Sequence, residues 1–415
     1  MTMETDILYK RCAGLDVHQR EVAACVRIVS DSLKLVVHTK RFETTPTGLR
    51  DMRAWLASHG ITHVAMEGTG VYWIPVYEAL RDGFDLTLCN AYHVKKVPGR
   101  KTDQSDAAWL AQLMSRGMLN KSFVPSAAIR ALRELTRTRV HRIEDRTRVV
   151  NGLHRLLERA GLKLCSVVSD LQGATARAIL TDLAAGVRDA AALAAHARGR
   201  LRAKRAALEA VLQTPLSPAE QFLLSQGLAT LKLTDEQIAA LDLRIRDGVA
   251  QYADQMKILM SVRGIDFIAA SAILAEIGPD MSVFRGSKGI SAWSGVAPGQ
   301  NESAGKRKRA MTRPGNPYLS RILVQVAIVL GRSKVPHDLT DFFRKKLPAL
   351  GFKKAAVATA HKLLVRLWRM LTDGKEYAPP PPRPLSDQQR ARRAKRHVDT
   401  LASLGFTVTL ERAAT

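Results

Sequence analysis

The sequence is poor in aromatic residues and in cysteine, and both shortages exclude classes of protein. Phe, Trp and Tyr together make up 5% of the 415 residues, which argues against a surface that binds mainly by stacking bases. The four cysteines (Cys12, Cys25, Cys89 and Cys165) include no C-x-x-C pair, so neither a cysteine-ligated zinc site nor a disulfide framework is expected. Buried thiols in a reducing compartment are the simplest interpretation.

Long apolar runs are also missing. The N-terminus, MTMETDILYKRC, lacks the apolar core of a secretory signal. The longest apolar run, Ile322–Leu330, is interrupted by Gln325 and is too short to span a bilayer. We therefore expect a soluble, cytoplasmic protein with no membrane partner.

Positive charge, by contrast, is abundant. The chain has 64 Lys and Arg against 38 Asp and Glu, a formal net charge of +26. Such an excess repels itself unless a polyanion neutralises it, and nucleic acid is the usual polyanion. Because an architectural protein would show the same excess, the charge indicates a nucleic-acid partner but does not identify an enzymatic activity.

Residues 1–125 alternate between strand and helix signals. Three adjacent strands are followed by helix, strand, helix, strand and helix, the order of a ribonuclease-H-like α/β domain. The last helix begins with the Asp and Ser residues that a first helical turn prefers. The expected strands are 12–17, 22–29, 35–42, 62–66 and 86–89, and the expected helices are 45–58, 71–81 and 102–114.

Residues 126–257 carry no strand signal and predict helical arms. Capping boxes at Ser217–Glu220 and Thr234–Gln237 each predict a helix start, with a break at Leu231–Leu233 between them. From Ile238 to Met256, apolar residues follow one narrow seam. This pattern is typical of a coiled coil, although a helix that covers the core of its own domain would show it too. Pairing within one chain or between chains is open.

The remaining chain divides into two regions. Residues 258–377 are expected to form a mostly helical C-terminal domain, and 378–415 a proline linker with a basic tail. Met260–Asp266, followed by apolar residues to Ile277, resembles a helix-hairpin-helix, whose turn offers N–H groups to a phosphate; a plain helical hairpin fits equally. The basic run Arg390–Arg396 indicates a phosphate-binding arm.

The helix expected after residue 126 is unusually rich in arginine. Arg133, Arg137 and Arg139 lie close together, and further arginines follow to residue 148. Because these are too many for one solvated stripe, we predict that the three residues contact nucleic-acid phosphates.

Four acidic residues stand where their side chains are expected to converge. Asp16 ends the first expected strand and Glu67 the fourth, so both emerge at one edge if these strands are neighbours. Asp103 and Asp106 are three residues apart at a helix start and therefore face the same way. Converging carboxylates repel each other unless a cation neutralises them. Mg²⁺ prefers oxygen ligands, and two ions can hold the attacking and leaving oxygens of a phosphodiester.

Three motifs around these residues carry a resemblance to a known family. They are GLDVH at Gly14–His18, EGTGVY at Glu67–Tyr72 and KTDQSDA at Lys101–Ala107. With them the chain resembles the DEDD-type insertion-sequence transposases, whose N-terminal domain is similar to the RuvC Holliday-junction resolvase. The family commonly has Ala after the glutamate, where this chain has Gly68.

A second block, residues 291–321, resembles the C-terminal domain of the same family. It holds a hydroxyl in a Gly-flanked loop beside basic residues suited to binding a phosphate: Lys306, Arg307, Lys308, Arg309 and, further on, Arg313. The residues alone do not single out Ser303, since a loop serine is usually a turn or surface residue. The resemblance gives Ser303 the role of nucleophile, forming a phosphoserine link. Ser291 and Ser294 stand in an apolar context suited to packing.

The resemblance implies a prokaryotic, nucleoid-associated recombinase that cuts and rejoins donor and target DNA with Mg²⁺. It also implies a structured bridge RNA as guide, and a homo-oligomer, dimer or tetramer, in which the carboxylates of one subunit meet the serine of another. Two alternatives stay open. One is a RuvC-like endonuclease that uses metal-bound water, and the other is a non-enzymatic nucleic-acid-binding protein whose acidic residues are helix caps.

Overall fold

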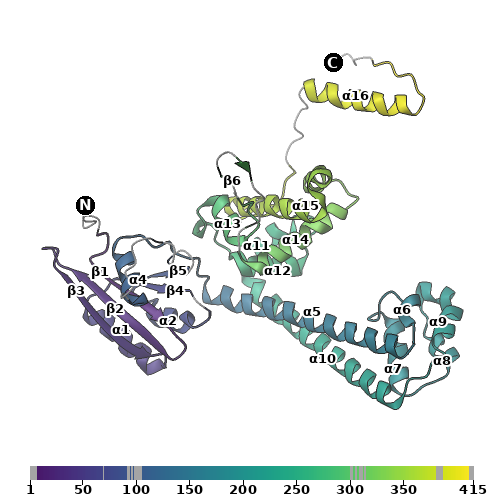
Figure 1. The fold of residues 1–415 in the computed structure, drawn as a ribbon, viewed down its shortest axis with the longest axis horizontal. Helices are drawn as coiled ribbons and strands as arrows, with labels where there is room; N and C mark the ends of the chain where they lie inside the picture. The colour runs from purple at the N-terminus through teal and green to yellow at the C-terminus, as the bar shows by residue number, and fades with distance from the viewer. Residues whose placement is uncertain are drawn as a thin grey trace. The chain divides into compact units, whose positions relative to one another are not determined.

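The chain forms two compact units, Met1–Ser126 and Ala127–Thr415, which are described separately (Figure 1). The computed structural model describes residues 7–68, 70–90, 94, 97, 105–299, 302–303, 306–307, 312, 315–379 and 387–410. Within these ranges, no helix is long and apolar enough to cross a lipid bilayer. The expected division of residues 127–415 into arm, C-terminal domain and tail stays a prediction.

The first unit is built on a five-stranded mixed sheet, which confirms the α/β expectation. Strands β1 to β3 are antiparallel neighbours, and β4 and β5 continue the sheet parallel to β1, in the order β3-β2-β1-β4-β5. This order is consistent with a ribonuclease-H-like domain. The strands are β1 (Arg11–Val17), β2 (Glu21–Val29), β3 (Leu35–Glu43), β4 (His63–Glu67) and β5 (Asp85–Cys89).

Helices cover both faces of this sheet. On one face, α1 (Pro46–Ser58) and α2 (Trp73–Leu80) bury apolar residues against the sheet. On the other face lies α4 (Asp106–Ser115), whose Trp109 and Leu110 pack against the sheet. Helix α1 begins where the sequence predicts, because the Thr45 hydroxyl accepts a hydrogen bond from the Gly48 N–H at 3.2 Å.

Two long helices of the second unit, α5 (Ala127–Arg159) and α10 (Pro218–Val249), lie side by side (Figure 1). Near one end of α5, Leu132 faces Gly248. Further along, the Arg146 guanidinium pairs with Asp235 at 2.7 Å. Since contacts that advance along α5 go backwards along α10, the helices are antiparallel. The predicted arms therefore pair within one chain; the coiled-coil character itself stays a prediction.

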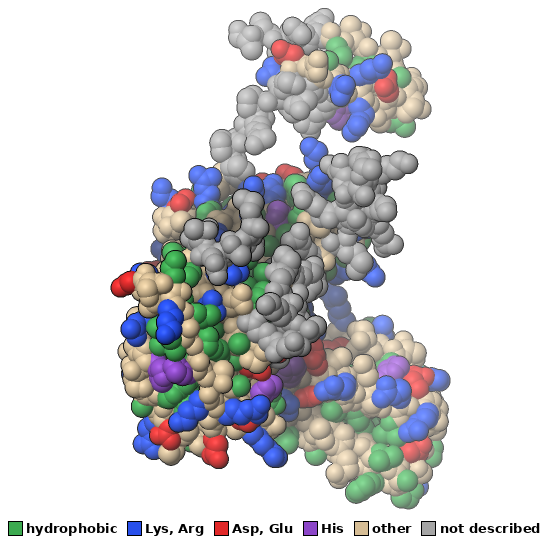
Figure 2. All heavy atoms as spheres, turned by 60° about the vertical axis from the view of Figure 1, so that its left-hand side comes forward, with side chains coloured by type: hydrophobic (Ala, Val, Ile, Leu, Met, Phe, Trp, Pro, Cys, Tyr) green, Lys and Arg blue, Asp and Glu red, His purple; other side chains and the backbone are tan. Residues whose placement is uncertain are grey.

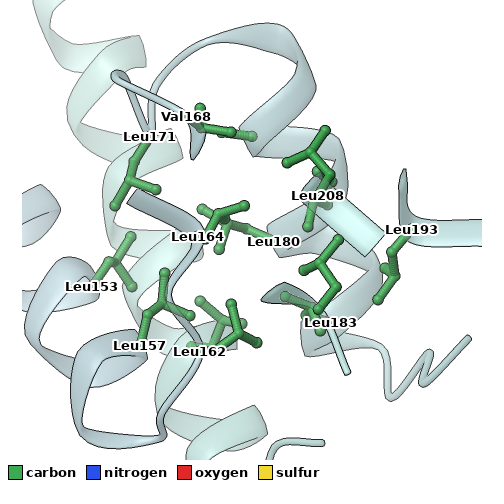
Figure 3. Packing of buried hydrophobic residues seen from close by; sticks show 14 of the residues in the cluster. Leu153, Leu157, Leu162, Leu164, Val168, Leu171, Leu180, Leu183, Leu193 and Leu208 are labelled. Carbon is green, nitrogen blue, oxygen red and sulfur yellow. The ribbon is translucent and has the colours of Figure 1, made fainter. Parts of the chain in front are cut away.

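A cluster of small helices closes the far end of this pair. Leucines from both long helices and from the small ones pack there into one core (Figure 3). This core gives the helical pair a folded tip. The small helices are α6 (Leu164–Val167), α7 (Ala174–Ala184), α8 (Ala190–Ala195) and α9 (Arg205–Val211), with a 3₁₀ turn at Gly199–Lys204.

The second predicted helix start on this arm was wrong. Helix α10 begins at the first capping box, where Ser217 and Glu220 cap each other, and continues unbroken past Thr234. The Thr234 hydroxyl donates to the Thr230 carbonyl at 2.8 Å, one turn back, in place of capping a new helix. The intervening Leu-Lys-Leu segment contains good helix formers and no breaker, so nothing ends the helix there.

The rest of the second unit is also mostly helical, as expected. A turn with Gly264 at φ 85° joins the helices Ala253–Met260 and Phe267–Ile277, which confirms a helical hairpin. Phosphate binding by this turn stays a prediction. The elements are α11 (Ala253–Met260), α12 (Phe267–Ile277), α13 (Gly286–Ser294), α14 (Pro317–Arg332), α15 (Asp338–Asp373) and α16 (Asp387–Ser403), with 3₁₀ turns at Ala250–Tyr252 and Met281–Val283 and the short strands β6 (Glu302–Ser303) and β7 (Lys306–Arg307).

The predicted basic arm contains helix α16. Its Arg390, Arg392, Lys395 and Arg396 side chains are exposed. Figure 2 shows Lys and Arg side chains over the surface of this helix, at the top of the view. Its binding to phosphates stays a prediction.

Candidate active site

Two of the four predicted carboxylates stand at equivalent positions on neighbouring strands. Leu15 of β1 pairs with Met66 of β4 in parallel register. Asp16 and Glu67 are the next residues on these strands, so both lie at the carboxyl edge of the sheet. The backbone pairing of the strands therefore places the two acidic residues side by side.

Both residues also belong to the same face of the sheet. Leu15 and Met66 are buried on the face covered by α1 and α2. Since successive side chains on a strand point to opposite faces, Asp16 and Glu67 face the α4 side. The Asp16 side chain is 29% exposed, which leaves it accessible to a ligand.

Helix α4 approaches this edge with its first turn. The Cys12 thiol donates to the Ala111 carbonyl at 3.3 Å. Two residues further along β1, a Cβ added to Gly14 would lie 2.2 Å from the carbonyl oxygen of Ala107. The helix thus runs opposite to β1, and its first residue, Asp106, lies toward the strand end that carries Asp16.

The structure thus brings Asp16, Glu67 and Asp106 to one edge and one face of the sheet, and we call them the acidic edge. The fourth predicted residue, Asp103, lies outside the described residues. Carboxylate oxygens are suitable ligands for Mg²⁺, and neighbouring strands are only about 5 Å apart. The chemistry of these donors suits a divalent ion, but among the residues described no three His, Cys, Asp or Glu side chains lie close enough together to hold one.

The thiols beneath the acidic edge are not candidate ligands. Burial raises the pKa of the Cys12 thiol to about 12. Burial, with a smaller contribution from the Glu67 carboxylate, raises the pKa of Cys89 to about 12 as well. Both thiols are protonated at neutral pH, and a hard cation such as Mg²⁺ takes oxygen ligands in preference to sulfur. All four cysteines are free, and three are buried, as expected.

His18 adds a group to which the sequence motif assigned no role. Its Nε2 lies 3.2 Å from Asp16 Oδ2, and its side chain is 59% exposed. A tight turn brings it there, because the His18 N–H donates to the Glu21 carbonyl. The signal for it is its position two residues after Asp16, on the same face of an extended chain.

The predicted nucleophile belongs to a segment whose two ends meet. Helix α13 ends at Ser294, followed by Gly295 in the left-handed region at φ 76°. A Cβ added to Gly315 would lie 2.2 Å from the Gly295 nitrogen, so only glycine fits between these backbones. The Asn316 N–H donates to the Trp293 carbonyl at 3.0 Å. We call residues 296–314, which these contacts close, the serine loop.

Ser303 lies in a short hairpin within this loop. It pairs through the backbone with Lys306, and Glu302 pairs with Arg307. Lys308, Arg309 and Arg313 lie outside the described residues. The two other serines pack as expected, since Ser291 and Ser294 are buried and their hydroxyls donate to backbone carbonyls of α13.

The three arginines of α5 that were predicted to contact phosphates have partners within the protein. Arg137 donates to both carboxylate oxygens of Glu276, at 2.8 and 2.9 Å, and Arg133 donates to the Glu276 carbonyl at 2.7 Å. Arg139 pairs with Asp242 of α10. Although burial acts to lower the pKa of Arg137, its bonds with Glu276 raise it. Phosphate contact by these arginines stays a prediction; the structure shows that Arg133 and Arg137 share one protein partner, Glu276, and that Arg139 has another.

Glu276 was not predicted from the sequence. Its side chain is 3% exposed, and its partners lie on α5 and at the start of α14. The one signal was that Glu276 is the sole charged residue of the helix Phe267–Ile277, where a lone carboxylate must find buried partners.

Two family profiles match the parts of the chain that carry this geometry. The profile of the DEDD transposase family of the IS110 type matches residues 13–161, which include the acidic edge. A second profile, described as a transposase of the IS116/IS110/IS902 family, matches residues 256–341, which include the serine loop.

Relatives with similarity over most of the chain carry related names. The transposase of insertion sequence element IS1111A from Coxiella burnetii is 25% identical over 330 residues, covering 78% of this chain and 81% of that protein. A putative transposase of Sinorhizobium fredii is 27% identical over 353 residues, 81% of this chain and 76% of the relative. An uncharacterized 42 kDa protein of insertion element IS900 from Mycobacterium paratuberculosis is 29% identical over 299 residues, 67% and 73%.

A sheet of this order with acidic residues at its carboxyl edge is the architecture of a nuclease-like catalytic domain. The chain belongs to the IS110 family of DEDD-type transposases and is an enzyme of the transposase class.

Proposed function

We propose that this transposase cuts and rejoins DNA strands with Ser303 as nucleophile and Mg²⁺ at Asp16, Glu67, Asp103 and Asp106. One observation carries the proposal most: Asp16 and Glu67 follow the paired residues Leu15 and Met66 and share one face at one edge of the sheet. An edge of this kind can hold a cation against a phosphodiester.

The acidic residues would hold the metal through their carboxylate oxygens. Mg²⁺ bound there would stabilise the negative charge on the phosphate oxygens while one P–O bond forms and another breaks. His18, 3.2 Å from Asp16, orients that carboxylate by a hydrogen bond.

The covalent step conserves bonds and is therefore reversible. The Ser303 oxygen bonds to phosphorus, one bridging P–O bond of the DNA breaks, and the displaced strand end leaves as a hydroxyl that takes up one proton as the serine loses one. Attack by another DNA hydroxyl reverses the step and restores the serine. The basic residues after Ser303 (Lys306, Arg307, Lys308, Arg309 and Arg313) stabilise the phosphate charge.

The partners proposed are donor DNA, target DNA and a bridge RNA. The net charge of +26 supports large polyanionic partners. The acidic edge and the serine loop belong to different compact units. We propose that they meet between subunits of a homo-oligomer, a dimer or tetramer, in which the coiled-coil character of α5 and α10 contributes to assembly.

Trapping the covalent adduct tests the nucleophile. The full chain is incubated with Mg²⁺, a labelled duplex covering the DNA that flanks its own gene, and RNA transcribed from that DNA; the mixture is then denatured. Ser303→Ala should abolish the protein–DNA adduct, whereas Ser282→Ala, on an exposed turn, should not. An adduct that survives Ser303→Ala refutes the assignment. Full cleavage by Ser303→Ala together with inactive Asp16→Asn would favour attack by water instead.

Mixing two inactive variants tests the composite site. Asp16→Asn and Ser303→Ala subunits, inactive alone, should regain cleavage when co-assembled, because each supplies the group that the other lacks. No recovery in a verified mixed oligomer would place both groups in one subunit. Omitting the RNA from the same reaction tests the guide: undiminished cleavage at the same position would contradict it.

A further inference from the structure

Glu276 is the most deeply buried carboxylate with several charged partners among the residues described, and the transposase mechanism above gives it no role. The Glu276 side chain is 3% exposed. Arg137 holds it with two hydrogen bonds at 2.8 and 2.9 Å. The Arg133 Nε lies 3.3 Å from Glu276 Oε2. Taking a carboxylate out of water is unfavourable, so this arrangement is stable only because the two guanidinium groups pair with it.

A third partner links Glu276 to the serine loop. The Asn316 side-chain amide donates to Glu276 Oε2 at 2.6 Å. Asn316 is also the N-cap of α14, since its Oδ1 accepts from the N–H groups of Tyr318 and Leu319 at 3.0 and 3.1 Å. Its backbone N–H closes the base of the serine loop on Trp293. One residue therefore joins the buried charge, the helix start and the loop base.

Arg137 strengthens the same connection from α5. Its guanidinium lies over the Tyr318 ring at 4.4 Å from the centroid. The Tyr318 hydroxyl in turn lies 3.1 Å from His141 Nε2 on α5. The first turn of α14 is thus fixed to α5 and α12 together.

The contact between Gly315 and Gly295 at the loop base couples the position of Asn316 to both ends of the serine loop. Gly315 and Gly295 touch backbone to backbone, with no room for a side chain. A displacement of Asn316 must therefore move both points at which residues 296–314 join the fold. Ser303 lies in this loop.

We propose that Glu276 is a positioning residue for the serine loop, acting through Asn316 and neutralised by Arg133 and Arg137. The inference rests on the proposed role of Ser303 as nucleophile. Glu276 touches no DNA in this proposal; its charge sets where the loop base stands. A neutral residue could accept a hydrogen bond from the Asn316 amide but would leave two half-buried guanidinium groups without a counter-charge.

Substitution of Asn316 separates positioning from capping. Asn316→Asp keeps an N-cap acceptor but turns a carboxylate against Glu276, so the loop base must shift. We expect adduct formation at saturating DNA to slow by about tenfold to a hundredfold, the range for a misplacement of about 1 Å. DNA affinity should be unchanged. Asn316→Ser, which also caps well but cannot reach Glu276 in the same way, is the milder second variant.

Exchanging the carboxylate of Glu276 with the amide of Asn316 should restore the rate of adduct formation. The double variant Glu276→Gln, Asn316→Asp restores an amide–carboxylate hydrogen bond with its ends reversed and keeps one negative charge near Arg137. It should recover most of the rate lost in Asn316→Asp, which a general loss of stability would not do. Asp145→Asn is the matched control, because it removes a carboxylate of α5 whose partners, Arg142 and Arg148, lie on the same helix and not on α14. Its rate should not change.

All variants are measured as full chains with the labelled flanking duplex and its RNA, after circular dichroism shows the wild-type helical signal. Unchanged adduct rates in both Asn316 variants would overturn the inference, as would a loss confined to DNA affinity or a double variant no faster than Asn316→Asp. An adduct that persists in Ser303→Ala would instead refute the proposed function, whatever the Asn316 variants do. If Asn316→Asp fails to fold, the rate of Asn316→Ser decides alone.

Discussion

The acidic edge of the first unit and the base of the serine loop in the second are positioned by different means. Asp16 and Glu67 are placed by backbone pairing of β1 with β4, which no single side chain controls. The loop base is closed by backbone contacts of its own, but its attachment to α5 and α12 depends on side-chain charges, Glu276 against Arg133 and Arg137, with Asn316 as the link. Substitutions at the acidic edge should therefore change chemistry without changing the fold, whereas substitutions around Glu276 should change both.

The largest expected effect is on chemistry. Asp16→Asn should lower strand cleavage by about ten-thousandfold, the loss typical of removing one catalytic group, because the amide cannot neutralise a cation. Its thermal unfolding should match wild type, since the 29% exposed side chain packs in no core. Cleavage of the labelled flanking duplex measures the rate, and calorimetry measures thermal unfolding. Asp31→Asn, which removes an exposed carboxylate from the same unit, is the control. Equal rates for both variants would contradict the role of Asp16.

Glu276→Ala should have the largest effect on stability. It leaves the half-buried guanidinium groups of Arg133 and Arg137, 14% and 29% exposed, without their counter-charge. We expect a loss of about 3 kcal/mol in the free energy of unfolding, the lower end of the range for a fully buried pair, because water still reaches both groups. Chemical denaturation of the full chain, monitored by the circular dichroism signal of its helices, measures this loss of free energy. Glu144→Ala, which breaks the exposed pair with Arg321, should leave the free energy almost unchanged. Similar losses in both variants would remove the contrast between buried and exposed pairs.

Gly14→Ala tests the backbone contact under the acidic edge. The added Cβ would lie 2.2 Å from the Ala107 carbonyl oxygen, so α4 must move away from β1. We expect a loss of about 1–3 kcal/mol, typical of overpacking, together with slower cleavage because Asp106 moves with the helix. Gly152→Ala, where the new Cβ would meet nothing within 4 Å, is the control and should not destabilise. If Gly14→Ala retains full stability and activity, the close contact of α4 with β1 at Gly14 is not needed for folding or for strand cleavage.

A second charged cluster of the helical unit predicts a pH dependence. Burial alone would raise the pKa of Asp338, but hydrogen bonds from Arg366 and Tyr377 lower it to about 2. The stabilisation is therefore complete above the ordinary pKa near 4 and is lost as the pH falls toward 2. It amounts to about 2 kcal/mol. Denaturation from pH 5 to pH 2 should show this loss in wild type and not in Asp338→Asn. Parallel curves for the two proteins would contradict it.

The smallest effect is expected in the basic tail. Replacing Arg390, Arg392 and Arg396 of α16 by Gln should leave unfolding unchanged, since these side chains are exposed. The dependence of DNA binding on salt should become shallower, by about 0.9 in log–log slope for each phosphate that the tail no longer neutralises. Fluorescence anisotropy with a labelled duplex measures this. An unchanged slope would mean that α16 binds no phosphate.

The parts that the sequence predicted correctly are those with local physical signals. Short apolar runs bounded by turn residues predicted the five strands, and the spacing of apolar residues after Thr45 predicted α1. The capping box at Ser217 predicted the start of α10, because its hydroxyl accepts from the Glu220 N–H. Asp16 and Glu67 could be expected at one edge because each follows an apolar strand. The capping box at Thr234 failed because the same residues also fit the interior of a helix that nothing interrupts.

The parts that were missed depend on distant partners. Arg133 and Arg137 have no local signal that separates a phosphate contact from an ion pair, and the carboxylate that binds them lies about 140 residues further along the chain. Nothing near Gly315 indicates that it touches Gly295, since this contact forms only when α13 and α14 pack. Long-range pairing of this kind comes from the tertiary fold.

The meeting of Gly295 and Gly315 has a consequence for how the enzyme can change. A segment that leaves and re-enters the fold at one point can vary in length while the helices stay in place, and doubling a flexible loop disfavours folding by only about 0.6 kcal/mol. We therefore expect that residues can be added to this segment without displacing α13 and α14, whose contact at Gly295 and Gly315 does not depend on the length of the chain between them.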